Sequence, residues 1–353
     1  MAEGRETEQE KRTNDRILLI INCVMLAIGS SGGPLILRLY FIHGGNRVWL
    51  SSFLQTAGFP FMLIPLTILY ICRKRTPGAT TKTSMVSIRP PLILAFTFVG
   101  VLTGLDNYLY AYGLARLPLS TSALIIASQL AFTAVFAFLL VMQKFKAYSV
   151  NAVVLLTLAA GVLALHTSAD RPDGESKKQY VMGFVMTLVA AALYGFVLPL
   201  VELAYKKTEQ SMTYSLVLEI QFVIGMFSSL FNIVGMIINN DFKVISREAK
   251  HFGLGEANYY VVLVGTAILW QAFFLGAIGV IYCASSLLSG IIIAVMLPVT
   301  EVLAVIFYQE KFQVEKGISL ILSIWGFAYY FYGEYKQAKK MKRNHALETG
   351  EQP

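Results

Sequence analysis

The sequence predicts an all-α membrane protein in which ten transmembrane helices form two five-helix repeats of opposite orientation. Of the 353 residues, 56% are hydrophobic and only 14% are charged, whereas soluble domains carry roughly 25% charged residues. Apolar runs of about 20 residues, the length that crosses a bilayer as a helix, recur along the chain. The second half of the chain also repeats the residue pattern of the first half.

The apolar runs are expected to be helices, because an open strand cannot satisfy its backbone polar groups in lipid. In chain order they cover approximately residues 17–39, 48–72, 91–114, 118–142, 149–168, 181–204, 214–238, 259–282, 284–308 and 315–333. The predicted organisation is an N-terminal tail over 1–16, a first repeat over 17–168, a linker over 169–180, a second repeat over 181–335 and a C-terminal tail over 336–353.

The internal repeat is clearest around the fourth and ninth apolar runs. The segment GLARLPLSTSALIIASQLAF begins at Gly113, and GVIYCASSLLSGIIIAVML begins at Gly279, so that Ser120 aligns with Ser286. Because each repeat contains an odd number of spans, the second repeat is predicted to lie upside down relative to the first. Inverted repeats of this kind are typical of carriers in which a central site opens alternately to the two sides of a membrane.

The basic residues predict that both termini are cytosolic. Most of the 29 Lys and Arg residues flank spans on the side of the termini, with dense clusters at 73–75 and 339–343. Such an excess marks the cytosolic side of membrane proteins. The net charge of +8 is therefore interpreted as a topology signal, and no nucleic-acid partner is expected.

Neither a metal site nor an enzymatic site is predicted. Cys23, Cys72 and Cys283 lack metal-ligand spacing, and we interpret them as small apolar residues. His166 alone cannot supply the clustered groups that catalysis requires. The charged residues at the start of the chain argue against a cleavable signal peptide. We expect no cofactor, and the proton gradient is the predicted driving force.

Four acidic residues fall inside predicted spans: Asp106, Glu202, Glu219 and Glu301. Ionisable residues in spans are costly and usually face a cavity or a partner. A carrier of phosphate or sugar nucleotides needs buried cations to pair with its anionic substrate. No Lys or Arg lies deep in a predicted span of this chain. The substrate is therefore expected to be neutral or weakly cationic.

Near the centre of the predicted spans lie amide and aromatic side chains that suit a planar heteroaromatic substrate. Amides pair with ring edges, and an indole stacks on ring faces. The candidate substrate-binding residues are Asn107, Tyr110, Gln129, Trp270 and Gln271. The alternative is that these side chains only contact neighbouring helices.

Asp106 and Glu301 are the candidates for proton coupling or substrate binding. Glu301 follows Pro298, which is expected to kink its helix. A carboxyl group buried there could bind and release a proton as access alternates. The alternative is an acid that a fixed hydrogen bond keeps neutral.

Four further residues are predicted to contribute to a possible gate: Gln55, Tyr194, Glu202 and Glu219. For the two glutamates, which lie near Lys206 and Lys207, solvated helix ends are the alternative interpretation. The small residues from Gly29 to Pro34 indicate either a hinge or a close helix-packing seam.

Long segments of the chain resemble a known family. They include IINCVMLAIGSSGGPLILRLYF, GLDNYLYAYGLA, LPLSTSALIIASQLAF, WQAFFLGAIG, CASSLLSG and LPVTEVLAV, within a resemblance that extends from Ile20 to Tyr335. The chain is similar to the plant purine permeases of the drug/metabolite transporter superfamily. The resemblance implies ten helices with cytosolic termini and proton-coupled uptake of adenine and related purines, including cytokinins and caffeine.

The resemblance leaves the preferred substrate open, because members of the family also take up alkaloids or pyridine-type compounds. An alkaloid- or vitamin-selective carrier is therefore an alternative, and a nucleotide-sugar or phosphate exchanger is a weaker one. The expected partners are a small purine-like molecule and the lipid bilayer. The plasma membrane is the expected location, and the oligomeric state is left open.

Overall fold

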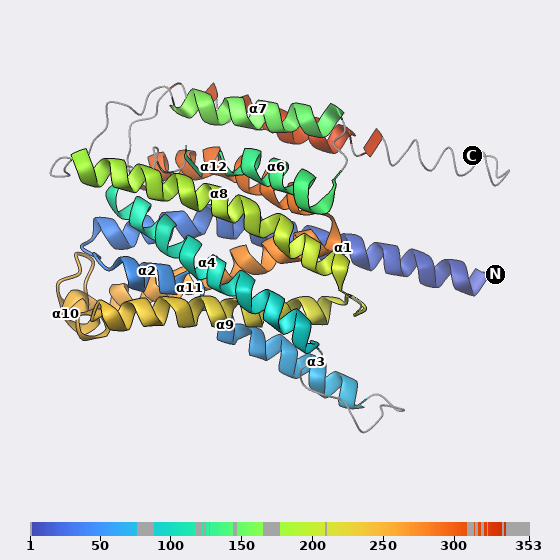
Figure 1. The fold of residues 1–353 in the computed structure, drawn as a ribbon, viewed down its shortest axis with the longest axis horizontal. Helices are drawn as coiled ribbons and strands as arrows, with labels where there is room; N and C mark the ends of the chain where they lie inside the picture. The colour runs from blue at the N-terminus through green and yellow to red at the C-terminus, as the bar shows by residue number, and fades with distance from the viewer. Residues whose placement is uncertain are drawn as a thin grey trace.

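A computed structural model describes residues 2–75, 88–117, 122, 125–126, 128–143, 147–164, 177–208, 210–308, 314, 317–318, 321–322, 324–333 and 335–336. These described residues form a bundle of long helices without any strand (Figure 1). His166, most of the predicted linker and nearly all of the C-terminal tail lie outside this part of the chain. The side chain of Glu301 is also outside it, although its backbone belongs to a helix.

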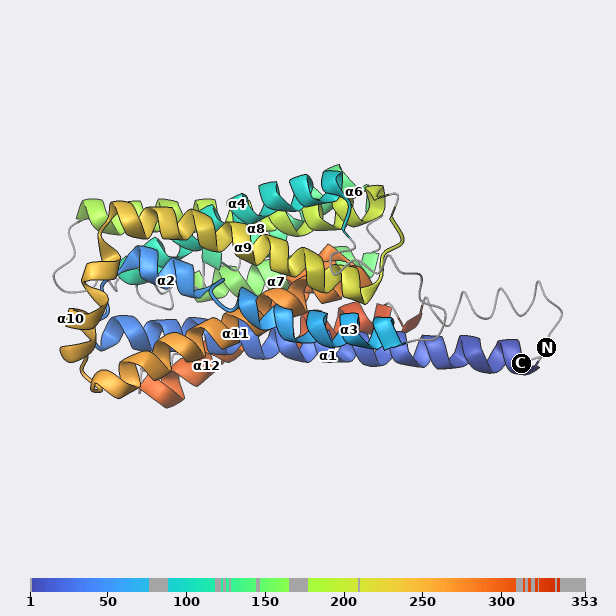
Figure 2. The ribbon, with the colours of Figure 1, turned by 90° about the horizontal axis from the view of Figure 1, so that it is seen from below.

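The first half of the chain supplies the helices of the predicted first repeat. They are α1 (Ala2–Ile42), α2 (Val48–Leu54), the 3-10 helix η1 (Phe59–Met62), α3 (Leu63–Arg75), α4 (Pro90–Arg116), α6 (Gln129–Val141) and α7 (Ala147–Ala164). The N-terminal part of α1 projects beyond the other helices (Figure 2).

The second half supplies four more long helices and a short connecting segment. They are α8 (Lys177–Lys207), α9 (Tyr214–Ile238), the 3-10 helix η3 (Asp241–Lys243), α10 (Ile245–Lys250), α11 (Glu256–Cys283) and α12 (Ser286–Tyr308). The short elements η3 and α10 join α9 to α11 at the end of the bundle opposite the projecting part of α1 (Figures 1 and 2).

Seven segments of the described chain are long and apolar enough to cross a membrane, and two shorter apolar helices accompany them. The shorter helices cover Gln129–Val141 and Val150–Ala159. The multi-span, all-helical class predicted from the sequence is confirmed. The count of ten spans stays a prediction, because the tenth apolar run is described only in pieces.

The second predicted span requires a correction, since it is not one continuous helix. The segment 48–72 is interrupted after Leu54 by a turn over 55–58 and by η1. Pro60 stands at the start of η1. Because proline has no N–H, it cannot continue the hydrogen-bond pattern of the preceding helix. Gly58 lies so close to α11 that an added Cβ would stand 2.6 Å from the carbonyl oxygen of Ala267. The break therefore brings irregular backbone against a neighbouring helix.

Helix packing follows the pairing that an inverted repeat requires. In the first predicted repeat, the first helix α1 packs along α11 and α12, the third and fourth helices of the second repeat. In the second repeat, the first helix α8 packs in the same way along α4 and α6 of the first repeat. Both halves thus meet along the centre of the bundle, where a site between them can form.

The contact of α1 with α11 depends on glycines. A Cβ on Gly33 would stand 2.9 Å from Cε2 of Trp270, and a Cβ on Gly29 would overlap the backbone of Phe273. From the opposite side, Gly276 meets the backbone of Leu26 just as closely. The Gly29–Pro34 run therefore forms a packing seam, as one of the two interpretations of the sequence proposed.

Candidate functional site

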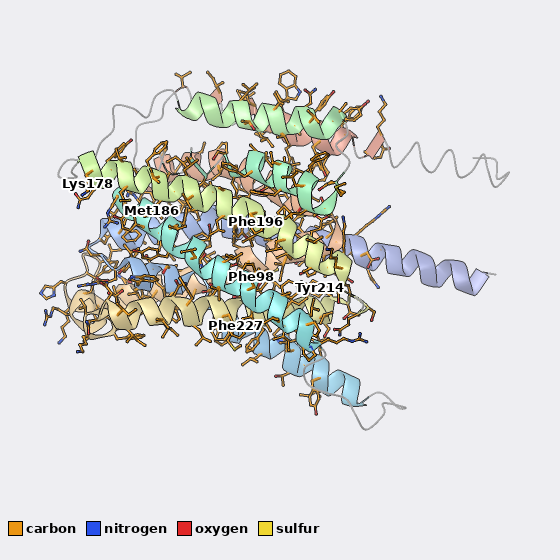
Figure 3. The ribbon with its side chains drawn as sticks, in the orientation of Figure 1. Phe98, Lys178, Met186, Phe196, Tyr214 and Phe227 are labelled. Carbon is orange, nitrogen blue, oxygen red and sulfur yellow. The ribbon has the colours of Figure 1, made fainter. Side chains whose placement is uncertain are left out.

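A cavity of about 60 Å³ lies at the centre of the bundle. It is lined by both predicted repeats, through Ser30, Pro34, Gln55, Asp106, Asn107, Tyr110, Ile126, Gln129, Ala190, Tyr194, Trp270, Phe273, Phe274, Ile293 and Leu297. Side chains fill the rest of the space between the helices, and apolar ones such as Phe98, which is 57% exposed, cover the outside (Figure 3). This polar-lined space inside an apolar bundle is our candidate site.

Most of the predicted site residues come together at this cavity. Four of the five candidate substrate-binding residues line it, namely Asn107, Tyr110, Gln129 and Trp270, and Asp106 does too. Gln55 and Tyr194, predicted as gate residues, also lie on its wall. Gln271 is not part of the lining: it is buried and its Cβ faces Gly58 at the break of the second span.

Asp106 is the ionisable acid of the cavity. Its side chain is only 7% exposed, and its Oδ1 atom has no hydrogen-bond partner. Among the described residues, no Lys or Arg lines the cavity. A buried acceptor without a partner costs about 1–3 kcal/mol, so this oxygen is available to a ligand or a proton.

Asn107 fixes the position of the polar wall. Its carbonyl oxygen accepts a hydrogen bond from Nε2 of Gln55 at 3.2 Å, and its Nδ2 donates to Oγ of Ser228 at 3.5 Å. These bonds tie α4 to the broken second span and to α9. Nearby, Asn232 and Ser52 are hydrogen bonded to each other. The interrupted helix is thus held by neutral hydrogen bonds on the flank of the cavity.

Five aromatic rings surround the other side of the cavity. The ring centroid of Trp270 lies 5.7 Å from that of Tyr110, 5.2 Å from Phe273 and 6.1 Å from Phe274. Tyr194 joins them at 5.7 Å from Phe273. These spacings fit edge-to-face and tilted packing. The indole Nε1–H of Trp270 is buried without an acceptor, so the aromatic wall also presents an unpaired donor.

Phe273 and Phe274 are site residues that our sequence reasoning missed. They follow Trp270 by three and four positions, which places all three on one face of α11. Gln271 follows Trp270 directly and is turned by about 100° around the helix. Helical spacing from Trp270 was the signal that could have identified the two phenylalanines.

Ser30 and Pro34 add an acceptor that the sequence analysis also missed. Proline has no N–H, so the helical hydrogen bond from residue 34 to the carbonyl of Ser30 cannot form. Both residues line the cavity, and the Ser30 hydroxyl itself donates to the carbonyl of Leu26 at 2.6 Å. The Ser30 carbonyl therefore lacks its usual helical partner next to the cavity.

Glu202 and Glu219 lie away from the cavity, toward the end from which α1 projects. Glu202 accepts a hydrogen bond from the backbone N–H of Ser286 at 2.7 Å and pairs with Lys206 at 2.8 Å. Glu219 accepts from the backbone N–H of Ile88 at 2.9 Å. Both glutamates are at most 5% exposed, so the alternative interpretation as solvated helix ends is wrong. They hold the beginnings of α12 and α4.

A third carboxylate lies at the opposite end of the bundle, in the short segment between α9 and α11. Glu248 on α10 accepts hydrogen bonds from Tyr40 at 2.5 Å, Tyr259 at 3.0 Å and the backbone N–H of Asn46 at 3.3 Å. These contacts join the end of α1 to α10 and the beginning of α11.

Asp241 reinforces this end of the bundle. It pairs with Arg47 at 3.6 Å and accepts a hydrogen bond from Asn239 at 2.8 Å. Burial raises the pKa of Asp241, and the contacts with Asn239 and Arg47 oppose that rise. The segment between α9 and α11 is therefore firmly attached to the helix ends.

An all-helical, multi-span bundle whose two halves pack pairwise around a central cavity has the architecture of a membrane transporter. The chain is similar to one crystal structure with a TM-score of 0.57. The match covers 90% of this chain and 96% of the crystallised chain. At 13% sequence identity this likeness supports the fold alone.

The family model for purine nucleobase transmembrane transport matches residues 17–340, and the chain belongs to this family. Among its relatives in Arabidopsis thaliana, purine permease 3 is 56% identical, with 95% of this chain and 96% of the relative covered. Purine permease 2 is 53% identical, over 92% and 94% of the two chains. The predicted resemblance is thereby confirmed, and the chain is a transporter rather than an enzyme.

Proposed function

We propose that the chain imports purine nucleobases and related heteroaromatic compounds, and that uptake is coupled to protons. Purine transport follows from the family. Support for the site comes from one observation: two residues that line the same cavity among aromatic rings each carry an unpaired polar atom, the acceptor Oδ1 of Asp106 and the donor Nε1 of Trp270. A purine carries N–H donors and ring-nitrogen acceptors on a planar ring, so it complements both walls.

In the proposed binding mode, the purine lies among the five rings and exchanges hydrogen bonds with the polar groups. The Trp270 N–H donates to a ring nitrogen, and Asp106 or the Ser30 carbonyl accepts from a ring or amino N–H. The Gln129 amide can do either. Because Oδ1 of Asp106 and Nε1 of Trp270 are otherwise unpaired in a buried site, a molecule lacking the matching groups is rejected more strongly than one with a slightly different size.

Proton coupling is assigned first to Asp106. A buried carboxylate without a cationic partner is costly, and loading a proton removes that cost. The protonated acid also gains an O–H donor for a ring nitrogen, so that proton and substrate favour each other's binding, and the coupling is reciprocal. Glu301 remains the second candidate from the sequence.

The decisive experiment is uptake of radiolabelled adenine into proteoliposomes with an imposed pH gradient. The proposal expects saturable accumulation that a protonophore abolishes. Gradient-driven accumulation that persists in both Asp106→Asn and Glu301→Gln would overturn the assignment of the proton. Failure of adenine and all other purines to enter would overturn the substrate class.

The same assay distinguishes the alternative substrates. A competition panel of adenine, cytokinins, caffeine, nicotine and pyridoxine tests whether the chain is an alkaloid- or vitamin-selective carrier. A phosphate or nucleotide-sugar exchanger is disfavoured because no cation lines the cavity among the described residues. Plasma-membrane location with cytosolic termini belongs to the proposal, and protease access to terminal tags on intact cells tests it.

A further inference from the structure

A second hollow lies on the flank of the bundle, between the beginning of α4 and the end of α8. This groove has a volume of about 520 Å³ and shares no residue with the central cavity. Its walls are Pro91, Leu92 and Ala95 on α4 and Leu200, Leu203 and Ala204 on α8. Arg89, Lys207 and Thr208 complete the lining. The groove therefore combines an apolar wall with two cations.

The two cations are exposed and have no carboxylate partner among the described residues. Arg89 uses its backbone N–H to donate to Gln210, but its guanidinium forms no ion pair there. Within the same described residues Lys207 forms no ion pair either, in contrast to its neighbour Lys206, which pairs with Glu202. Two unpaired positive charges beside an apolar wall are complementary to an anionic headgroup that carries acyl chains.

The groove lies at a depth where such a lipid would be found. The beginning of α4 and the end of α8 lie at the end of the bundle from which α1 projects (Figure 1). Both are termini of candidate membrane spans, so we expect Arg89 and Lys207 at the boundary between headgroups and acyl chains. By the charge distribution of the sequence, this side faces the cytosol, where the leaflet is rich in anionic lipids.

We propose that this groove binds one anionic phospholipid, with its phosphate between Arg89 and Lys207 and an acyl chain along α4 and α8. The first backbone N–H groups near the beginning of α4 are already used, since those of Ile88 and Arg89 donate to Glu219 and Gln210. The contact with the phosphate therefore falls to the two side chains. Because α4 and α8 come from different repeats, the lipid bridges them.

The bridge has a consequence for transport. Arg89 and Lys207 are each one residue from a contact that holds this end together, Ile88 with Glu219 and Lys206 with Glu202. A lipid bound between the two helices stabilises their contact at this end of the bundle. The content of anionic lipid is therefore expected to change the transport rate without changing the substrate preference.

Native mass spectrometry of the full-length protein with phosphatidylglycerol tests the proposal. Each basic residue at a membrane surface raises affinity for anionic lipid roughly fivefold. We therefore expect Arg89→Ala/Lys207→Ala to weaken phosphatidylglycerol binding about 25-fold. The matched control is Lys11→Ala/Arg16→Ala, which removes the same charge from the N-terminal segment on the same side, and it should bind as the wild type does.

A second variant, Ala204→Trp, keeps both charges and fills the apolar wall. It should also release the lipid, because the acyl chain loses its place. Phosphatidylcholine and inorganic phosphate serve as probes for the alternatives, and neither should compete. The proposal is overturned if the double variant retains phosphatidylglycerol, if the control loses it equally, or if inorganic phosphate displaces it. Adenine uptake in phosphatidylcholine vesicles verifies that the variants fold.

Discussion

The buried carboxylates of the central cavity and of the α1-projecting end differ in their partners. At the cavity, Asp106 has an oxygen without a hydrogen bond. At the end of the bundle, Glu202 and Glu219 are equally buried but accept hydrogen bonds from backbone N–H groups at 2.7 and 2.9 Å. Burial alone therefore does not identify a functional acid. An unpaired acid is available for exchange with a ligand or proton, whereas a paired one stabilises the fold.

The strongest test of this comparison is Asp106→Asn. The amide keeps the shape of the side chain but cannot release a proton at physiological pH, so concentrative adenine uptake driven by a pH gradient should be lost. Exchange of internal for external adenine needs no net proton movement and should persist, weakened about fivefold if one hydrogen bond is lost. Equal loss of both activities would show that Asp106 only binds substrate.

Glu219→Ala tests the other side of the comparison. The backbone N–H of Ile88 would lose its acceptor, which should lower the free energy of unfolding by about 1–3 kcal/mol. Thermal unfolding in detergent measures the change. Glu219→Gln retains an acceptor oxygen and should restore most of the loss, while Asp106→Asn should leave the melting temperature at or above the wild-type value. A Glu219→Ala protein as stable as the wild type would contradict this role.

Trp270→Phe examines the unpaired donor opposite Asp106. The substitution keeps an aromatic ring but removes the indole N–H, so KM for adenine should rise about fivefold. The melting temperature should fall modestly, because the smaller ring leaves a cavity in the core. Trp49→Phe is the matched control, because Trp49 stacks on Tyr108 at 3.9 Å and does not line the cavity. An equal rise of KM in both variants would assign the effect to general packing.

The smallest effect is expected for Pro34→Ala. Alanine supplies an N–H that can bond to the carbonyl of Ser30, so this acceptor is withdrawn from the cavity. Adenine affinity should fall by a factor of about two to five, while thermal stability rises. Unchanged affinity combined with raised stability would show that the Ser30 carbonyl does not bind substrate.

The sequence predicted much of the cavity because depth along a helix follows from residue number. Asp106, Asn107, Gln129 and Trp270 were found in this way. Gln271 was placed with them by depth alone, but its direction around α11 turns it toward Gly58. Depth is a one-dimensional property, whereas the lining also requires the rotation of each helix about its axis.

Other features could not be predicted because they depend on a second segment of chain. The break of the second span brings Gly58 against α11. The local sequence around Gly58 does not show that this turn will contact α11. The burial of Glu202 and Glu219 likewise depends on where α12 and α4 begin. The depth of each acid was foreseen, but the backbone N–H group that it binds was not.

The glycine seam between α1 and α11 has a consequence for how the molecule moves. Backbones that touch at Gly29 and Gly276 leave no side-chain layer that could slide or repack, so these two helices behave as one rigid body. They belong to different predicted repeats, and α1 contacts α11 more extensively than any other helix. The duplicated unit is therefore not the moving unit. A moving body that contains α1 and α11 would therefore draw on both predicted repeats.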